Sequence, residues 1–351
     1  MRFALLTSTP LSPTEGSGTF VAIDGLARGL GALGHAVAVR PLRLRTGFHT
    51  LDRYLYNAGA RLVPPAGDVV VGVDLDGFLW ARRRPRPRFV VMLKGVIADE
   101  ARNERGLVRA LLLAQARWER LNTERADRVI VPSRYSASVA ADAYAIPPGK
   151  IAVVPEPLDL AEWRRRFAAA GRRAPGRPTV LSVARMYPRK RLGDLLQAAA
   201  ILRARIPGVQ IRIVGDGPES RHLRALHAEL GLGDAAVLLG QVSRAQLAVE
   251  YVSALCFCLP TVQEGFGLVF AEAMAAGLPV VACRVAAVPE VVEDRRTGFL
   301  VNPRSPDELA MAMETLLMNE GLAKDFGTAG ARRVEAFDLV PVARRFLEAL
   351  P

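Results

Sequence analysis

The stretch LPTVQEGFGLVFAEAMAAGLPVVA, residues 259–282, decides how the rest of this chain is interpreted. The apolar run 254–259 predicts a buried strand, and the run 268–276 predicts a helix that a glycine terminates. Glu264 therefore follows the carboxyl end of a strand, and Glu272 lies about one turn inside the helix. The first N–H groups of a helix can donate to phosphate or sugar oxygens, and carboxylates accept from hydroxyl groups. The pattern predicts a site for an anionic ligand with several hydroxyl groups.

The length and composition indicate two α/β domains. Half of the 351 residues are apolar, which is enough for two hydrophobic cores. Short apolar runs alternate with helical patterns along the chain, as is typical of parallel α/β sheets. We therefore expect two Rossmann-like, doubly wound domains that face each other across a cleft. No apolar run is long enough to span a membrane, and the N-terminus predicts a first strand rather than a signal peptide.

The expected strands are short runs rich in Val, Ile and Leu. They lie at 2–7, 36–40, 68–73, 88–93, 128–131 and 151–154, and then at 179–183, 210–214, 236–239, 254–259, 280–282 and 298–301. Helices are expected at 21–33 and 99–124, whereas 41–65 shows no regular period. A connection with Pro and Arg residues, 170–178, is the expected linker between the domains.

The net charge of +12 is distributed unevenly. Residues 1–170 contain 25 Lys and Arg against 16 Asp and Glu, whereas residues 178–351 contain 19 of each. A basic first half steers acidic partners toward it. We expect no nucleic acid among these partners, because no DNA- or RNA-binding module is recognisable and the aromatic residues are not interleaved with the basic runs.

The stretch 259–282 resembles the signature of the retaining glycosyltransferases of family 4, which have the GT-B fold. That signature has two glutamates separated by seven residues, follows Pro-Ser/Thr and contains Gly-Phe-Gly; here its residues are Pro260, Thr261, Glu264, Gly265, Phe266, Gly267 and Glu272. The resemblance implies that Glu264 and the amides up to Leu268 hold the donor sugar, and that Glu272 binds the ribose of the nucleotide. It covers nearly the whole chain and is strongest over 179–302.

The GT-B resemblance also implies the roles of the domains. Residues 1–169 would form a Rossmann-like acceptor-binding domain, 170–178 the linker, and 179–340 a Rossmann-like domain that binds the nucleotide sugar. The last segment, 341–351, is expected to be a helix that packs back on the first domain.

On the donor side, Arg185 and Lys190 follow the first strand of the second half. Two cations there could neutralise a diphosphate and stabilise the charge that grows on it when the glycosidic bond breaks. Family 4 has the same pair at the same spacing, in contact with the donor diphosphate. The resemblance also implies that Gly215 shapes the nucleotide pocket and that the loop around Val242 holds a uracil or guanine base.

Two glycines of the first half are expected to approach the donor phosphates. Family members usually carry two adjacent glycines after the first strand, and this chain has Gly16 and Gly18 there, separated by Ser17. Both permit close backbone approach, although Gly-Ser-Gly turns are common in any loop.

The position after the strand 88–93 departs from the family pattern. Many members have a histidine there that contacts the donor sugar, and this chain has Lys94. A charged lysine cannot accept a hydrogen bond as a neutral imidazole can. Two interpretations stay open: Lys94 binds an acidic acceptor or donor sugar in a pocket that includes Asp99, or Lys94 forms an ion pair with Asp99 or Glu100.

The sequence also contains an Asp-x-Asp pattern, at Asp74 and Asp76. This pattern suggests the divalent metal site of the other large glycosyltransferase fold, GT-A. Because the remaining motifs resemble the metal-independent GT-B fold, we expect no metal and no cofactor beyond the nucleotide-sugar substrate.

A basic amphipathic segment in the first half has two interpretations. The helix expected at 99–124 mixes leucines with arginines, and a second basic run lies at 82–88. Such helices can lie on anionic membranes, and several family members use this region to reach lipid acceptors. The ordinary alternative is a solvated helix with one core-facing stripe.

These residues predict a retaining, metal-independent hexosyltransferase of cell-envelope glycan biosynthesis, with Arg185, Lys190 and Glu264 as catalytic residues. The hexose would move from a UDP- or GDP-linked donor to a hydroxyl group of a glycan, a lipid or a small molecule. We expect the protein in the cytoplasm or at the inner face of the membrane. The alternatives are a sugar-nucleotide epimerase or hydrolase of the same fold and a catalytically weak nucleotide-sugar-binding protein.

Overall fold

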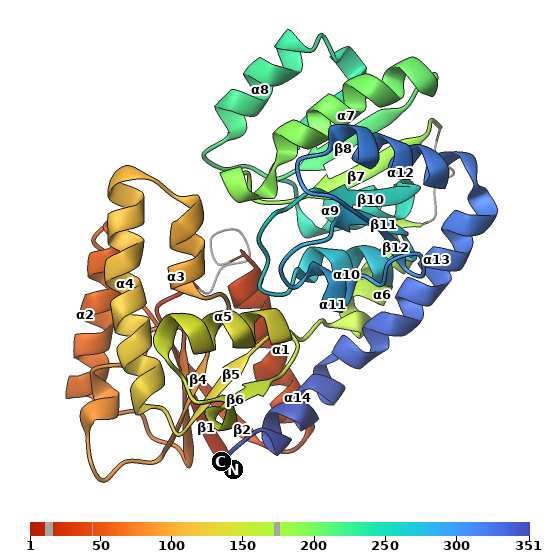
Figure 1. Ribbon diagram of the computed structural model, residues 1–351. Helices are drawn as coiled ribbons and strands as arrows, with labels where there is room; N and C mark the ends of the chain where they lie inside the picture. The colour runs from red at the N-terminus through yellow and green to blue at the C-terminus, as the bar shows by residue number, and fades with distance from the viewer. Residues whose placement is uncertain (11–16, 44, 172–175) are drawn as a thin grey trace. The chain divides into compact units, whose positions relative to one another are not determined.

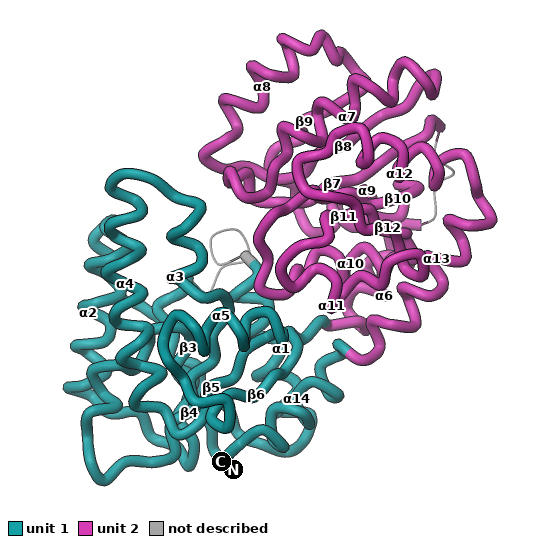
Figure 2. The backbone as a smooth tube through the Cα atoms, viewed as in Figure 1, with its two compact units in different colours: residues 1–158, 337–351 teal, residues 159–336 magenta. Residues whose placement is uncertain are grey.

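The computed structural model describes all residues except 11–16, 44 and 172–175 (Figure 1). The chain folds into two compact units, which Figure 2 shows in different colours. Unit 1 contains Met1–Leu158 and Phe337–Pro351, and unit 2 contains Asp159–Ala336. The chain therefore passes from one unit to the other twice.

A parallel six-stranded sheet forms the centre of unit 1, in the order β2-β1-β3-β4-β5-β6. The strands are β1 (Arg2–Thr7), β2 (Ala36–Pro41), β3 (Val69–Val73), β4 (Arg88–Met92), β5 (Arg128–Val131) and β6 (Ile151–Val153). The inner strands are mostly apolar, with Val prominent in β3, β4 and β5, because helices cover a parallel sheet on both faces. Alternate residues of β1 show both faces: Phe3 and Leu5 lie in one core, and Ala4 and Leu6 lie in the other.

Helices cover both faces of the unit 1 sheet. On one face, α1 (Ser17–Ala32) and α14 (Leu339–Glu348) pack together, and the Phe346 ring meets the Phe3 ring edge-on. On the other face lie α4 (Gly106–Arg125) and α5 (Arg134–Tyr144). The helix α2 (His49–Leu62) and the short α3 (Ile97–Glu100) complete the unit.

Unit 2 repeats this design with the strand order β12-β11-β10-β7-β8-β9. Its strands are β7 (Thr179–Val183), β8 (Gln210–Val214), β9 (Ala236–Gly240), β10 (Cys256–Leu259), β11 (Val280–Cys283) and β12 (Gly298–Val301). Its helices are α6 (Leu160–Ala170), α7 (Leu192–Arg205), α8 (Ser220–Glu229), α9 (Arg244–Ser253), α10 (Leu268–Ala275), α11 (Val288–Val291), α12 (Pro306–Met318) and α13 (Glu320–Arg333). In the part of the chain that the structure describes, no helix is long and apolar enough to cross a membrane.

Each sheet has one point at which the winding direction reverses. In unit 1, β1 leads to β2 on one side, and the chain then returns to β3 on the other side of β1. In unit 2, the chain runs from β7 outward to β9 and returns to β10 on the opposite side of β7. The loops after the two central strands diverge at such a point and leave room at the carboxyl edge of the sheet, where ligands of α/β proteins bind.

The predicted strands are confirmed within one or two residues at each end. Two helical predictions were wrong. The segment 41–65 contains α2, whose inward face is polar (Asp52, Arg53 and Asn57), so the sequence shows no apolar period there. The single helix expected at 99–124 is divided into α3 and α4, because Gly106 adopts a positive φ of 54° at the start of α4.

The two crossings of the chain lie at 158/159 and 336/337, away from the linker expected at 170–178. Helix α6 precedes that expected linker and lies in unit 2, because it packs against α9 through the rings of Trp163 and Tyr251. Near the two crossings, the amide of Leu158 donates to the carbonyl of Phe337 at 2.8 Å. The final helix α14, two residues longer at its start than the segment expected, belongs to unit 1.

The packing of α14 on α1 depends on a glycine. A Cβ at Gly29 would lie 2.5 Å from the carbonyl oxygen of Leu339, whereas a Cβ at Gly31, also in α1, would meet no atom within 4 Å. We predict that Gly29→Ala lowers the free energy of unfolding by about 1–3 kcal/mol. Gly31→Ala should leave it unchanged or raise it by up to about 1 kcal/mol. Urea unfolding of both variants checks this, and equal effects would contradict the close approach of α14.

Candidate active site

The loops after β7 and β10 meet at the reversal point of unit 2. The amide of Val262 donates to the carbonyl of Arg189 at 2.9 Å, and the hydroxyl of Thr261 donates to the same oxygen at 3.2 Å. These bonds fix the loop after β10 against the loop after β7. As a result, the Lys190 Nζ forms an ion pair with the Glu264 Oε1, and both side chains are only 12–13% exposed. The structure thus brings together two of the three predicted catalytic residues.

The third predicted catalytic residue, Arg185, lies in the same loop after β7. Its guanidinium stands over the ring of Tyr187, 5.5 Å from the centroid, and the Arg189 guanidinium stands 5.0 Å from the same centroid. A cation over an aromatic face is attracted by the ring quadrupole, so Tyr187 holds two positive groups at this end of the sheet. Tyr187 was not predicted from the sequence, although an aromatic residue between two arginines was a usable signal.

The Gly-Phe-Gly turn starts α10. Gly267 has a φ of 94°, and a Cβ there would lie 2.6 Å from the Phe270 ring, so this position requires glycine. Phe266 is buried and anchors the turn, and the carbonyl of Glu264 accepts from the amide of Ala287 at 3.3 Å. The turn therefore aims the N-terminus of α10, beginning at Leu268, toward the carboxyl edge of the sheet beside Glu264.

Glu272 lies on α10 and is partly buried. The hydroxyl of Tyr251 donates to its Oε2 at 3.0 Å. Burial raises the pKa of Glu272 to about 7, while the Tyr251 hydrogen bond and the positive charge of Arg244 act in the opposite direction. The carboxylate is thus held in one orientation, and its charge is sensitive to pH near neutrality.

Gly215 and Val242 lie at the carboxyl ends of β8 and β9. A Cβ at Gly215, whose φ is 128°, would lie 1.9 Å from the carbonyl oxygen of Ala184. Its amide donates to the carbonyl of Gly240 at 2.8 Å. Gly215 therefore permits close packing of the neighbouring loops, and its part in a nucleotide pocket stays a prediction. Val242 is half-buried in the loop that precedes α9.

The glycines predicted for unit 1 are described only in part. Gly16 lies outside the described residues, and Gly18 is exposed in the first turn of α1. Whether they approach a phosphate stays a prediction.

Lys94 forms an ion pair, but not with the partners that the sequence suggested. Its Nζ lies 2.7 Å from the Oε2 of Glu156, and the two side chains are 6% and 8% exposed. The pairing with Asp99 or Glu100 was wrong, because Asp99 instead accepts from Tyr135 at 2.9 Å and from Arg102 at 3.3 Å. Glu156 was not predicted as the partner of Lys94. Its position just after the strand β6 was the signal in the sequence that could have indicated it.

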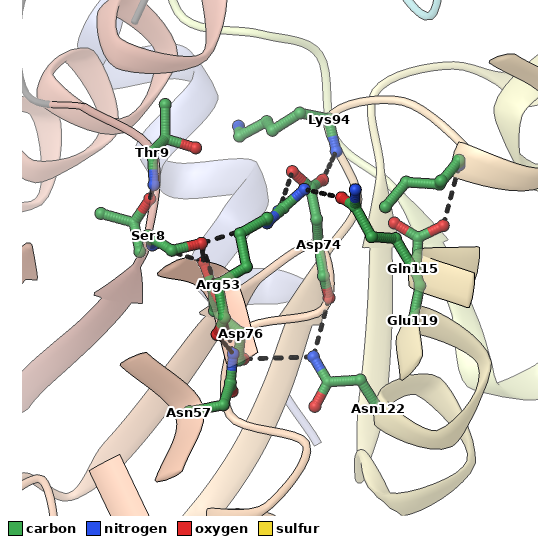
Figure 3. Close-up of polar contacts among 12 residues, drawn as sticks. Ser8, Thr9, Arg53, Asn57, Asp74, Asp76, Lys94, Gln115, Glu119 and Asn122 are labelled. Atoms are coloured by element: carbon green, nitrogen blue, oxygen red, sulfur yellow. Dashed lines mark hydrogen bonds and ion pairs between the residues drawn. The ribbon is translucent and has the colours of Figure 1, made fainter. Parts of the chain in front are cut away.

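The Asp-x-Asp residues belong to a buried polar network at the reversal point of unit 1 (Figure 3). Asp74 accepts from the amide of Lys94 at 2.8 Å and lies 3.5 Å from the Arg53 guanidinium. Asp76 accepts from the amide of Ser8 at 2.5 Å and from the side chain of Asn57 at 3.0 Å. Burial raises the pKa of Asp76 to about 6. Both carboxylates are therefore bound by other groups of the protein. The Asp76 carboxylate, which follows β3, also ties the loop after β3 to Ser8 in the loop after β1.

Helix α4 contributes the opposite wall of this network (Figure 3). Gln115 accepts from the Arg53 guanidinium at 3.0 Å, and Asn122 donates to the carbonyls of Asp74 and Asp76. Glu119 accepts from the amide of Ile97 at 2.9 Å. Removing one partner from such a network leaves another charge buried in the low-dielectric interior without a compensating partner, which strongly destabilises the folded state.

Two family models match this chain over its separate halves. Residues 164–333 match the model described as glycosyl transferases group 1, and residues 68–162 match the model described as Glycosyltransferase Family 4. The chain belongs to glycosyltransferase family 4. The predicted family is confirmed, and the reversal point of unit 2, with Lys190 and Glu264, lies within the first matched region.

Curated relatives align with part of the chain. A GDP-mannose-dependent alpha-(1-6)-phosphatidylinositol monomannoside mannosyltransferase of Mycobacterium tuberculosis is 36% identical over 189 residues, which are 52% of this chain and 48% of that protein. D-inositol 3-phosphate glycosyltransferase 2 of Catenulispora acidiphila is 34% identical over 226 residues, which are 60% of this chain and 53% of that protein. The chain spans about half the length of the curated relatives it matches.

A solved structure matches over nearly the whole length. Sucrose-phosphate synthase from Thermosynechococcus elongatus superposes with a TM-score of 0.81 at 23% identity, covering 99% of this chain and 97% of that one. At this identity the likeness concerns the fold, which is GT-B with two Rossmann-like units. The predicted fold class is confirmed.

The raised pKa of Glu272 gives a stability prediction. The folded protein retains this proton up to about pH 7, whereas the unfolded chain loses it near the ordinary value of 4.5. The unfolding free energy therefore falls as pH rises through this range, by up to about 3 kcal/mol at pH 8. Glu272→Gln should remove this loss, so the variant gains stability over the parent as pH rises. Urea unfolding between pH 4.5 and 8 measures the difference.

The control for this experiment is Glu229→Gln, which replaces an exposed glutamate at the end of α8. Its unfolding curve should follow the parent at every pH. Parallel pH dependence of the parent and Glu272→Gln would contradict the assigned burial.

Proposed function

We propose that this protein transfers a hexose from a nucleotide diphosphate sugar to an acceptor hydroxyl group, with retention of configuration and without a metal ion. The observation that carries the proposal is the meeting of Lys190 with Glu264 at the reversal point of unit 2, beside the N-terminus of α10. An anion-binding helix end, two cations and the Glu264 carboxylate then lie at the edge where α/β sheets bind ligands, and Glu272 lies about one turn inside that helix.

The Lys190–Glu264 pair would open when the donor binds. A diphosphate offers Lys190 a more highly charged partner than the carboxylate, and Arg185 adds a second cation. The two cations stabilise the negative charge that develops on the leaving phosphate, which is the task a metal ion performs elsewhere. Glu264, released from the lysine, accepts from a hydroxyl of the sugar, and Glu272 accepts from the ribose.

The transfer itself needs no enzymic nucleophile. The acceptor oxygen forms a bond to the anomeric carbon on the face from which the diphosphate departs. The bond between that carbon and the phosphate oxygen breaks, and the proton of the acceptor hydroxyl passes to the departing phosphate. This front-face substitution retains the anomeric configuration and uses only the groups named above.

Guanine is the nucleotide base that the name of one mycobacterial relative supports. The Mycobacterium tuberculosis relative is named as GDP-mannose-dependent, and its identity to this chain is 36% over the aligned half. We therefore propose GDP-mannose as the first donor to test, with UDP-sugars as the alternative.

The acceptor side of unit 1 has a surface suited to an anionic membrane. At the start of α4, Leu107 is 74% exposed and Val108 and Leu111 are also exposed; near the start of α2, Phe48 is 74% exposed. Residues 105–118 contain three arginines and no acidic residue. Exposed apolar residues flanked by arginines bind anionic lipid surfaces. We therefore propose a lipid-linked acceptor that is reached from a membrane surface.

A transfer assay tests the proposed reaction. We expect turnover with GDP-mannose or a UDP-hexose in the presence of EDTA, and a product with the anomeric configuration of the donor by NMR. Lys190→Ala should lower kcat by about 10²–10³-fold, because it removes a charge that stabilises the transition state. Lys324→Ala, an exposed lysine of α13, should leave kcat unchanged. Strict dependence on Mn²⁺ or Mg²⁺, or an inverted product, would contradict the mechanism.

Vesicle co-sedimentation tests the proposed membrane surface. At low salt the protein should sediment with phosphatidylglycerol vesicles and not with phosphatidylcholine vesicles, and the double variant Leu107→Glu/Leu111→Glu should lose this binding. The control is Met311→Glu/Met318→Glu, which changes two exposed apolar residues at the other unit's helix α12. Equal sedimentation of the parent with both lipids, or with neither, would reject this partner.

A further inference from the structure

Glu272 receives its hydrogen bond from a tyrosine that has no other polar partner recorded among the described residues. Tyr251 lies on α9 and is fully buried, and its hydroxyl reaches the Oε2 of Glu272 on α10 at 3.0 Å. Arg244, in the first turn of the same helix, contributes the positive charge felt by this carboxylate. A buried phenol of this kind finds a partner because leaving its hydroxyl unpaired would be costly.

The ring of Tyr251 is itself fixed by aromatic neighbours from two other elements. Trp163 of α6 meets it edge-on at a centroid distance of 5.5 Å, and Phe167 of the same helix lies at 6.1 Å. On β10, Phe257 stacks on it at 6.2 Å. Trp163 and Phe167 also stack on each other at 5.2 Å. The phenol oxygen therefore has one available position, and the carboxylate of Glu272 is oriented from it.

We infer that Tyr251 is a positioning residue for the donor nucleotide, acting through Glu272. The inference rests on the proposed function, in which Glu272 accepts from the ribose hydroxyls. The phenol occupies one carboxylate oxygen and leaves Oε1 with its lone pairs for the ribose. A binding side chain whose rotamer is fixed before the ligand arrives loses little conformational freedom on binding. Support from a neighbouring side chain, here Tyr251, keeps such a binding group in its productive geometry.

A second, simpler role would be structural only. In that case Tyr251 merely satisfies its own buried hydroxyl, and loss of the hydroxyl would lower stability without a preference among ligands. The two roles differ in one respect: a positioning residue matters only for ligands that possess the ribose hydroxyls. Ribonucleotides and their dideoxy forms therefore separate the two roles.

The test is isothermal titration of GDP and UDP, and of 2′,3′-dideoxy-GDP and 2′,3′-dideoxy-UDP, against the full chain and Tyr251→Phe. The variant keeps the ring and removes only the hydroxyl. We expect Tyr251→Phe to lower the affinity for the preferred ribonucleotide about tenfold, because one hydrogen bond to a charged group is lost. The affinity for the dideoxynucleotides should stay unchanged. In the transfer assay its donor KM should rise by a similar factor, with kcat at saturating donor within twofold of the parent.

Two further variants complete the design. Tyr144→Phe removes the matching hydroxyl of a buried tyrosine that donates to Glu119 in unit 1, and it should lower stability without changing nucleotide affinity. Trp163→Phe keeps the Tyr251 hydroxyl but reduces the packing against its ring. It should lower the affinity for the ribonucleotide less than Tyr251→Phe does, and it should leave the affinity for the dideoxy form unchanged.

The outcomes distinguish this inference from the proposed function. If Glu272→Ala lowers the affinity for the ribonucleotide and Tyr251→Phe does not, the proposed donor site stands and the positioning role of Tyr251 is rejected. Equal weakening of the ribonucleotide and dideoxy forms by Tyr251→Phe also rejects it, because the effect is then structural. If the parent binds neither GDP nor UDP, or if Glu272→Ala has no effect, the proposed donor site fails and the inference fails with it.

Discussion

The structure depends on one constraint, the reversal of winding direction in each parallel sheet. Both sheets are covered by helices on their faces, so polar groups gather at the carboxyl edge, where the loops after two central strands diverge. The two units occupy this edge in different ways. Unit 1 joins the diverging loops through the buried carboxylate of Asp76, which Ser8 binds. Unit 2 joins them through hydrogen bonds to the Arg189 carbonyl and, among side-chain charges, through the Lys190–Glu264 ion pair.

The two reversal points differ in how many groups hold the diverging loops together. In unit 1, the carboxylates of Asp74 and Asp76 have two or more protein partners each, so the network is suited to fixing one arrangement of α2 and α4. In unit 2, Lys190 and Glu264 pair one charge with one charge across the point where the loops diverge. A ligand can replace one ion pair far more easily than a whole network, because fewer hydrogen bonds have to be exchanged. This contrast supports our proposal that the donor site lies in unit 2.

The sequence was informative where the pattern is local. Apolar runs predicted the strands, and the Gly-Phe-Gly turn with its two glutamates indicated the edge of unit 2 at which Lys190 and Glu264 meet. The misses come from contacts that join distant segments. Helix α2 was missed because its inward residues are polar and pair with α4 and the sheet edge. Glu156 and Tyr251 were missed because each contacts one residue, Lys94 or Glu272, that lies far from it in the sequence. Helix α6 was placed before the linker because its packing partner α9 lies about 80 residues later.

A crystal structure with GDP or UDP bound tests the central claim most directly. We predict ribose hydroxyls within hydrogen-bonding distance of Glu272, a diphosphate in contact with Lys190 and Arg185, and a Lys190–Glu264 pair that has separated. A nucleotide bound away from the carboxyl edge of β7 and β10, or a diphosphate that touches neither cation while the pair stays closed, would contradict it.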